Sequence, residues 1–403
     1  MKNFKVALIS HEFPPFAIGG IGYQCYDLAY SLSRKKIDTV VLCGKSPHKR
    51  VEKPNDFLTV IRLPYIDVPP RYFWFQLQNF RVMQKLLDDC SIIHGVNPIS
   101  SAIAAYYKTM LGKPFVVTCH HSGLLELKEL LNQPASEWTL GNLGITVLSY
   151  PLDEIVLMNI CLENADRIVV PGLSTFNYIK NTVGNLDSGK TTVIHNGIDF
   201  TKIDRIIAES SEDCKVDDSL DGETTIAFFG RLVSTKGIMY LLEAMTILSA
   251  EFPRLRLNIF GKGPLEPKIR AKLNSSGLQS RVRLHGYVSY NHLISQISKA
   301  SVVALPSLVE VGPFIAALEA MACKKPLVLF DSDFSREFIS DMHNGLLAKA
   351  CDSKDLSEKI RILLSDNKLL RRIGQNAQTY VKNNHDWAIL VDKYIETYKK
   401  ASQ

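Results

Sequence analysis

The chain lacks the sequence signatures of several common functional classes. Its eight cysteines are scattered, none of them forms a CxxC pair, and no His/Cys/Asp/Glu cluster has metal-ligand spacing. Scattered thiols of this kind are typical of a reducing compartment. A GxxxxGK[ST] loop, an HExxH motif, an EF-hand loop and a Ser-His-Asp order are also missing. These absences argue against a metal centre and against P-loop or catalytic-triad chemistry.

Long hydrophobic runs are missing as well. The N-terminal residues MKNFKVALISHEFPP contain no long apolar region and no small-residue cleavage site, so they predict a buried strand and not a signal peptide. The most apolar later window is interrupted by Pro151, Asp153 and Glu154, which disfavours a membrane span. The net charge of +6 suits phosphate-bearing substrates or an anionic membrane surface, but it is too small to indicate nucleic acid. We therefore expect a cytoplasmic protein.

Alternating apolar runs and helical segments define the fold class. The first half contains FKVALIS, TVVLC, SIIHG, PFVVTCH, DRIVVPG and TTVIHNGI, and the second half contains TIAFFGRL, RLNIFGKG, VRLHGYV, SVVALPS and PLVLF. Such alternation predicts an α/β protein with two doubly wound parallel-sheet (Rossmann-like) domains facing a cleft. A polar stretch from Ala208 to Glu223 reads as a linker or surface excursion. We expect domains at 1–200 and 201–380, followed by a terminal amphipathic helix at 381–403.

The stretch from Ala304 to Leu327 carries the most informative chemistry. It reads as a strand, a Gly/Pro turn and a helix, with Glu310 at the turn and Glu319 in the helix. A helix N-terminus attracts anionic groups, and a carboxylate beside it can accept hydrogen bonds from hydroxyls. A sugar nucleotide offers both kinds of group, whereas the alternative interpretation is a βα unit with two solvated glutamates.

Two further loops in the second half follow buried strands. In FFGRLVSTKG the strand ends at Gly230, and Arg231 and Lys236 precede a helix. Two cations at a strand's carboxyl end predict a pyrophosphate site, with solvated surface cations as the alternative. In IFGKGP, Gly261 and Gly263 are expected to flank the nucleotide.

The first half offers three candidate features. Gly19 and Gly20 lie in AIGGIG, where glycines let the backbone approach a ligand, although a flexible turn is the alternative. His120 ends a strand and could donate or accept across the cleft, but it could equally be a structural histidine. Basic residues (Lys45, His48, Lys49, Arg50 and Lys53) and the aromatic run Arg71–Phe75 predict peripheral contact with an anionic membrane at its inner face. The alternative is a solvated loop and a core-facing helix.

Together these pieces resemble the family 4 glycosyltransferases, retaining enzymes of the GT-B fold. The resemblance rests on GGIG, SIIHG, VVTCH and VIHNGID in the first half, and on FFGRLVSTKG, IFGKGP, the block with the two glutamates, and HNGLL in the second. It implies a second domain that binds a nucleotide-sugar donor and a first domain that binds the acceptor.

The resemblance also implies roles for individual residues. Arg231 and Lys236 match the residues that hold the donor diphosphate, and Glu319 matches the carboxylate that takes the ribose hydroxyls. Glu310 and His120 match residues near the transferred sugar, and the Gly19–Gly20 backbone matches the loop over the donor phosphates or acceptor. The terminal helix around Trp387 looks like the family's helix that crosses back onto the first domain.

The function implied is transfer of a sugar, of hexosyltransferase type, from a nucleoside-diphosphate sugar to an acceptor hydroxyl in glycan or glycolipid synthesis. It implies no metal and no cofactor beyond the donor. Two departures stand out: Glu310 and Glu319 are nine residues apart, one more than is usual, and Lys324 stands where glycine is usual. The alternatives are a GT-B epimerase or phosphorylase, or a two-domain sugar-binding protein.

Overall fold

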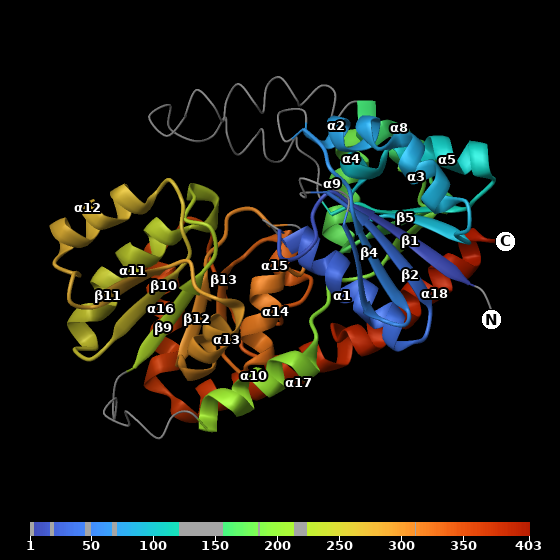
Figure 1. Cartoon of the computed structure of the whole chain (residues 1–403). Coiled ribbons are helices and arrows are strands. Elements are labelled where there is room, and N and C mark those ends of the chain that lie inside the picture. The colour runs from blue at the N-terminus through green and yellow to red at the C-terminus, as the bar shows by residue number, and fades with distance from the viewer. Residues whose placement is uncertain are drawn as a thin grey trace. The chain divides into compact units, whose positions relative to one another are not determined.

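The structure, a computed structural model, divides into two compact units (Figure 1). One unit comprises Met1–Gly197 and Trp387–Gln403, and the other comprises Ile198–Asp386. The residues described are 4–16, 20–44, 50–66, 71–120, 156–183, 186–212, 224–310 and 312–403.

The first unit is built on an eight-stranded sheet with the order β3-β4-β2-β1-β5-β6-β7-β8. Its strands are β1 (Lys5–Ser10), β2 (Asp38–Cys43), β3 (Arg50–Asn55), β4 (Leu58–Arg62), β5 (Ile92–Gly95), β6 (Phe115–Thr118), β7 (Arg167–Val170) and β8 (Thr191–Val193). All neighbours are parallel except β3 and β4, which form an antiparallel hairpin at one edge. The six predicted strands are all present, and the hairpin is an addition.

Successive side chains of a buried strand point to opposite faces of this sheet, so each strand contributes to two hydrophobic cores, one on each face. In β1, Ala7 and Ile9 join the core under α2–α5 and α8, while Val6 and Leu8 join the core under α1 and α18 (Figure 1). The helices are α1 (Gly20–Arg34), α2 (Arg71–Gln78), α3 (Phe80–Leu87), α4 (Pro98–Ser101), α5 (Ile103–Leu111), α8 (Met158–Asn164), α9 (Leu173–Val183) and α18 (Trp387–Ala401). The continuous apolar runs of the sequence are therefore strands covered on both sides.

The terminal helix α18 is fastened to the first sheet by a buried histidine. His94 of β5 hydrogen-bonds through Nδ1 to the Tyr398 hydroxyl (2.8 Å) and through Nε2 to the Thr118 hydroxyl (2.8 Å). Burial, with a smaller contribution from the neighbouring His120, lowers the pKa of His94 to about 3. The imidazole is therefore neutral in the folded protein at any ordinary pH.

This neutral histidine predicts a pH-dependent stability. An unfolded histidine binds a proton near pH 6.5, whereas folded His94 does not, so its stabilisation is present above pH 6.5 and is lost as the pH falls toward 3. The slope is at most about 1.4 kcal/mol per pH unit. We expect His94→Gln to flatten the loss of stability between pH 6.5 and 4.5 in urea unfolding, relative to the exposed control His292→Gln. Identical slopes in the two variants would contradict this.

The second unit contains a six-stranded, fully parallel sheet with the order β11-β10-β9-β12-β13-β14. Its strands are β9 (Thr225–Phe229), β10 (Arg256–Phe260), β11 (Val282–Gly286), β12 (Val302–Leu305), β13 (Leu327–Phe330) and β14 (Leu346–Ala348). Its helices are α10 (Phe200–Glu212), η4 (Ser234–Lys236), α11 (Ile238–Glu251), α12 (Glu266–Ser276), α13 (Tyr290–Lys299), α14 (Ile315–Ala322), α15 (Asp333–Arg336), α16 (Ser353–Ser365) and α17 (Asn367–Asn384). The five predicted strands are present, and β14, built from part of the HNGLL motif, completes the sheet.

Some element boundaries differ from the predicted ones. Residues 381–384, assigned to the terminal helix from the sequence, instead continue α17, because Val381 is buried in the core of the second unit. A new helix begins only at Trp387. Residues 208–212 of the polar stretch are the last residues of α10, and 213–223 lie outside the described residues.

Lys324 adopts a left-handed conformation, with φ 58°, at the end of α14. Its backbone N–H donates to the Met321 carbonyl (3.0 Å), so the turn is the one that glycine usually makes. We expect Lys324→Gly to stabilise the second unit by about 1 kcal/mol, since the left-handed region is costly for residues with a Cβ. Thermal unfolding would show a rise of about 2–4 °C. The control Lys382→Gly, within α17, should lower stability by a similar amount.

Candidate functional site

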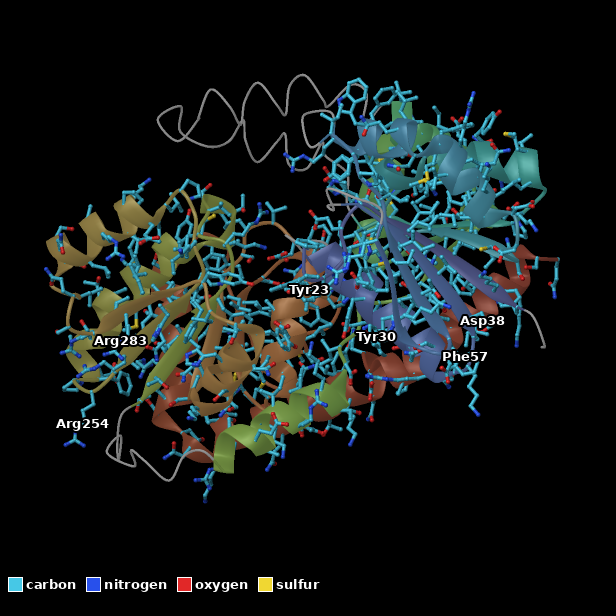
Figure 2. The ribbon with its side chains drawn as sticks, in the orientation of Figure 1. Tyr23, Tyr30, Asp38, Phe57, Arg254 and Arg283 are labelled. Carbon is cyan, nitrogen blue, oxygen red and sulfur yellow. The ribbon has the colours of Figure 1, made fainter. Side chains whose placement is uncertain are left out.

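Three adjacent strands of the second unit bring most of the candidate residues to one edge of the sheet. β10, β9 and β12 are neighbours, and their carboxyl ends are followed by Gly261, by Gly230 and Arg231, and by Pro306. In parallel α/β sheets this edge is where ligands bind. Cations elsewhere on the unit, such as Arg254 before β10 and Arg283 on β11, are exposed to solvent (Figure 2).

The loops after β9 and β10 are hydrogen-bonded to each other. Gly230 N–H donates to the Phe260 carbonyl (3.0 Å), and Leu232 N–H donates to the Lys262 carbonyl (3.0 Å). Gly261 has φ 134°, and a Cβ there would lie 1.9 Å from the Gly230 carbonyl oxygen. Glycine is therefore required at Gly261 so that the two backbones can approach.

The loop after β9 is also locked to the segment after β12. Gly237, at φ 67°, precedes α11, and a Cβ there would lie 1.9 Å from the Pro306 carbonyl oxygen. Leu308 N–H donates to the Thr235 carbonyl (2.7 Å). This close backbone approach places Lys236 next to Glu310.

Lys236 and Glu310 form a direct ion pair between the ammonium and Oε1. Their side chains are 22% and 14% exposed, and the Phe314 ring centroid lies 5.8 Å from the ammonium. The extra residue between Glu310 and Glu319 therefore does not carry Glu310 away from this edge. Phe314 was not singled out from the sequence, since an isolated aromatic residue before a helix carries no distinctive pattern.

Arg231 and Glu319 complete this group. The Arg231 side chain is exposed and makes no ion pair with any residue that the structure describes. Glu319 is 8% exposed on α14, whose N-terminus has no side-chain cap. Burial, with a smaller contribution from the nearby Glu319 carboxylate, raises the pKa of the Cys323 thiol to about 12. The edge thus combines two cations, two carboxylates and an uncapped helix start.

The other three predicted residues belong to the first unit. His120 is buried just after β6 and lies close enough to His94 to lower the pKa of that histidine. Gly20 is the first residue of α1, which corrects the expectation of a loop continuing to Gly22. The helix starts early because Gly22, Gln24 and Cys25 are buried, which draws the first turn into the fold. Gly19 lies outside the described residues.

Two family models match this chain, one in each half. Residues 18–202 match the family Glycosyltransferase Family 4, and residues 211–380 match Glycosyl transferases group 1. The chain belongs to the glycosyltransferases that these two models describe, group 1 and family 4. It is an enzyme of the transferase class, and its two parallel-sheet α/β domains are those of the GT-B fold.

Individual relatives span the whole glycosyltransferase. An uncharacterised glycosyltransferase of Methanocaldococcus jannaschii is 25% identical, with 99% of each chain covered. Sucrose-phosphate synthase from Thermosynechococcus elongatus has a similar structure, with a TM-score of 0.77, 21% identity and 98% of each chain covered. HepE from Anabaena, in complex with UDP and glucose, gives a TM-score of 0.72 at 16% identity, covering 98% of this chain and 99% of its own.

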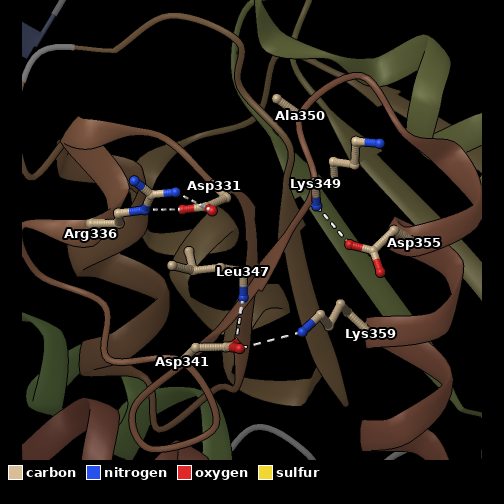
Figure 3. Close-up of a pocket in the computed structure, with 8 residues that line it drawn as sticks. All are labelled: Asp331, Arg336, Asp341, Leu347, Lys349, Ala350, Asp355 and Lys359. Atoms are coloured by element: carbon tan, nitrogen blue, oxygen red, sulfur yellow. Dashed lines mark hydrogen bonds and ion pairs between the residues drawn. The ribbon is translucent and has the colours of Figure 1, made fainter.

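A separate hollow of about 590 Å³ lies at the ends of β13 and β14 of the glycosyltransferase (Figure 3). Its lining residues are Asp331, Arg336, Asp341, Leu347, Lys349, Ala350, Asp355 and Lys359. All three aspartates are engaged within it: Asp331 by Arg336 (2.6 Å), Asp341 by Lys359 (3.3 Å) and Asp355 by the Lys349 N–H (2.6 Å). We interpret these contacts as structural, because they tie α15 to the segment after β13 and tie α16 to the residues on either side of β14.

Only some of the residues predicted to face a membrane lie in the described part of the glycosyltransferase. Arg50 and Lys53 lie on the edge strand β3 and not in a loop, and Arg50 pairs with Glu52 (3.3 Å). Lys45, His48 and Lys49 lie outside the described residues. The aromatic run opens α2, where Phe75 is fully buried, as the core-facing alternative requires. No helix in the described parts of the chain has both the length and the apolar character needed to span a membrane. Peripheral membrane contact stays a prediction.

Proposed function

We propose that this glycosyltransferase is a retaining enzyme that moves a hexose from a nucleoside-diphosphate sugar to an acceptor hydroxyl, in glycan or glycolipid synthesis. The observation that carries the proposal is the placement of Arg231, Lys236, Glu310 and Glu319 at one sheet edge. Cations there suit a diphosphate, and carboxylates suit hydroxyls. The likeness to HepE, whose structure holds UDP and glucose, supports this choice of donor.

In the proposed reaction the bond from the anomeric carbon to the diphosphate oxygen breaks, and its electron pair leaves with the diphosphate. Arg231 and the Lys236 ammonium stabilise the developing negative charge. The acceptor oxygen bonds to the anomeric carbon from the same face, and its proton passes to the departing phosphate oxygen. Glu319 accepts hydrogen bonds from the ribose hydroxyls, and Glu310 lies toward the sugar. No covalent glycosyl-enzyme intermediate is involved.

The test combines binding and turnover. Nucleoside diphosphates and their sugars should raise the melting temperature, because a ligand of the folded state stabilises it. Nucleoside diphosphate release should then require both a donor sugar and a hydroxyl acceptor from a panel of sugars, polyol phosphates and lipid-linked sugars. Conversion of the donor alone would favour the epimerase alternative, and dependence on inorganic phosphate would favour a phosphorylase.

Turnover is expected to persist in excess chelator. The cations Arg231 and Lys236 supply the charge that a divalent metal supplies in other transferases. Among the described residues no group of three or more His, Cys, Asp or Glu is arranged to hold a metal ion. The measurement is product formation with EDTA against added magnesium or manganese. Complete loss in EDTA, restored by either metal, would contradict metal independence.

A further inference from the structure

The ion pair between Lys236 and Glu310 has a consequence for ligand choice. The ammonium proposed to bind the donor diphosphate already contacts a carboxylate, and both side chains are largely shielded from water. The two residues are held together by backbone contacts on either side, from Leu308 to Thr235 and at Gly237 beside Pro306. The backbone of this edge therefore holds the two side chains close enough to form the ion pair.

A diphosphate that approaches this ammonium meets an anion already bound to it. Like charges close together in a partly desolvated site repel each other. A free nucleoside diphosphate must either share Lys236 with Glu310 or displace the carboxylate. It carries no transferable sugar whose hydroxyls could donate hydrogen bonds to the displaced carboxylate. Arg231, the other cation of the edge, makes no ion pair among the described residues, so the competition falls on Lys236.

A donor sugar changes this balance because it carries hydroxyl groups next to its diphosphate. Those hydroxyls can donate hydrogen bonds to a carboxylate released from Lys236, which compensates Glu310 for the lost ammonium. The same carboxylate therefore weakens the binding of the free diphosphate but does not weaken the binding of the nucleotide sugar.

We propose that Glu310, through its ion pair with Lys236, makes the site favour the nucleotide-sugar donor over the nucleoside diphosphate product. This inference rests on the proposed function, since it assumes that Lys236 binds the diphosphate. It assigns to Glu310 a role in selecting donor over product, and it implies that transfer of the sugar itself weakens the hold on the leaving group.

The test uses Glu310→Gln and Glu310→Ala, with Glu266→Gln as the control. Glu266 is a carboxylate of the same unit that pairs with Arg270 (2.7 Å) and not with Lys236, so its variant removes one negative charge without touching the ion pair. Isothermal titration would use pyrophosphate and three pairs of ligands: UDP with UDP-glucose, GDP with GDP-mannose, and ADP with ADP-glucose.

For the pair that binds wild type, we expect both Glu310 variants to bind the free diphosphate about tenfold more tightly, with pyrophosphate following in the same direction. The nucleotide sugar should gain no affinity, so the donor-to-product preference falls about tenfold, and Glu266→Gln should match wild type. Unchanged or weaker diphosphate binding in the Glu310 variants would overturn the inference, as would an equal gain for donor and product. If no diphosphate, nucleotide sugar or pyrophosphate binds any of the proteins, the proposed function itself is wrong.

Discussion

Lys236→Ala is expected to weaken nucleoside diphosphate binding about a hundredfold, and Arg231→Ala about tenfold. A hydrogen bond to a charged group contributes about 1.5–3 kcal/mol, which spans this range. We expect the larger loss for Lys236 because its removal also leaves the Glu310 carboxylate without a partner ammonium at the place where the phosphate binds. The measurement is isothermal titration with the diphosphate that stabilises the wild type most.

The matched control for this pair is Arg254→Ala. Arg254 is an exposed cation of the same unit, but it precedes β10 and so lies at the amino end of that strand (Figure 2). Its loss changes the net charge equally without altering the candidate site. If all three variants bind the diphosphate equally well, the assignment of Arg231 and Lys236 fails.

Gly237→Ala is expected to destabilise the second unit by about 3 kcal/mol and to impair diphosphate binding. The added Cβ would lie 1.9 Å from the Pro306 carbonyl oxygen, in a residue with φ 67°. Left-handed backbone costs about 1–2 kcal/mol for a residue with a Cβ, and the rest comes from pushing the two loops apart. Since that contact holds Lys236 beside Glu310, the site should be lost with it.

Gly277→Ala separates the two causes. Gly277 has nearly the same backbone conformation, φ 69°, but a Cβ there meets nothing within 4 Å. We expect a cost of about 1–2 kcal/mol and unchanged diphosphate binding. Chemical unfolding and titration of both variants would show the difference. Equal stability losses with intact binding would mean that the Pro306 contact does not shape the site.

The sequence predicted the buried parts of the fold better than the exposed ones. A strand covered on both faces, such as β1 or β9, leaves a continuous apolar run that is hard to mistake. β3 is exposed along nearly its whole length, and β14 has only three residues, so neither leaves such a run. The early start of α1 at Gly20 was missed because three glycines in AIGGIG indicate a loop, and only burial of the first turn overrides that signal.

In the candidate site, the positions of single residues were predictable from the local sequence, but a contact between distant residues was not. Strand ends and glycines located Arg231, Lys236 and Glu310, because each of them follows a recognisable buried strand. The pairing of Lys236 with Glu310 was not predictable, since 74 residues separate them. It arises from the backbone approach of Gly237 to Pro306, which no pattern within either segment encodes.

The discontinuity of the first unit affects the order in which the chain can fold during synthesis. One face of its sheet is covered by α1 and α18 together, and Tyr398 of α18 forms a hydrogen bond with His94 in the middle of the sheet. A ribosome makes Trp387–Gln403 only after it has made all of Ile198–Asp386, so the second unit can be complete while the part of this face that α18 covers is still exposed. Cutting the chain after Gly197 would not isolate the first unit. Gly197 lies against Trp387 and Leu390, however, so a short linker from residue 197 to residue 387 would join its two pieces into one contiguous domain.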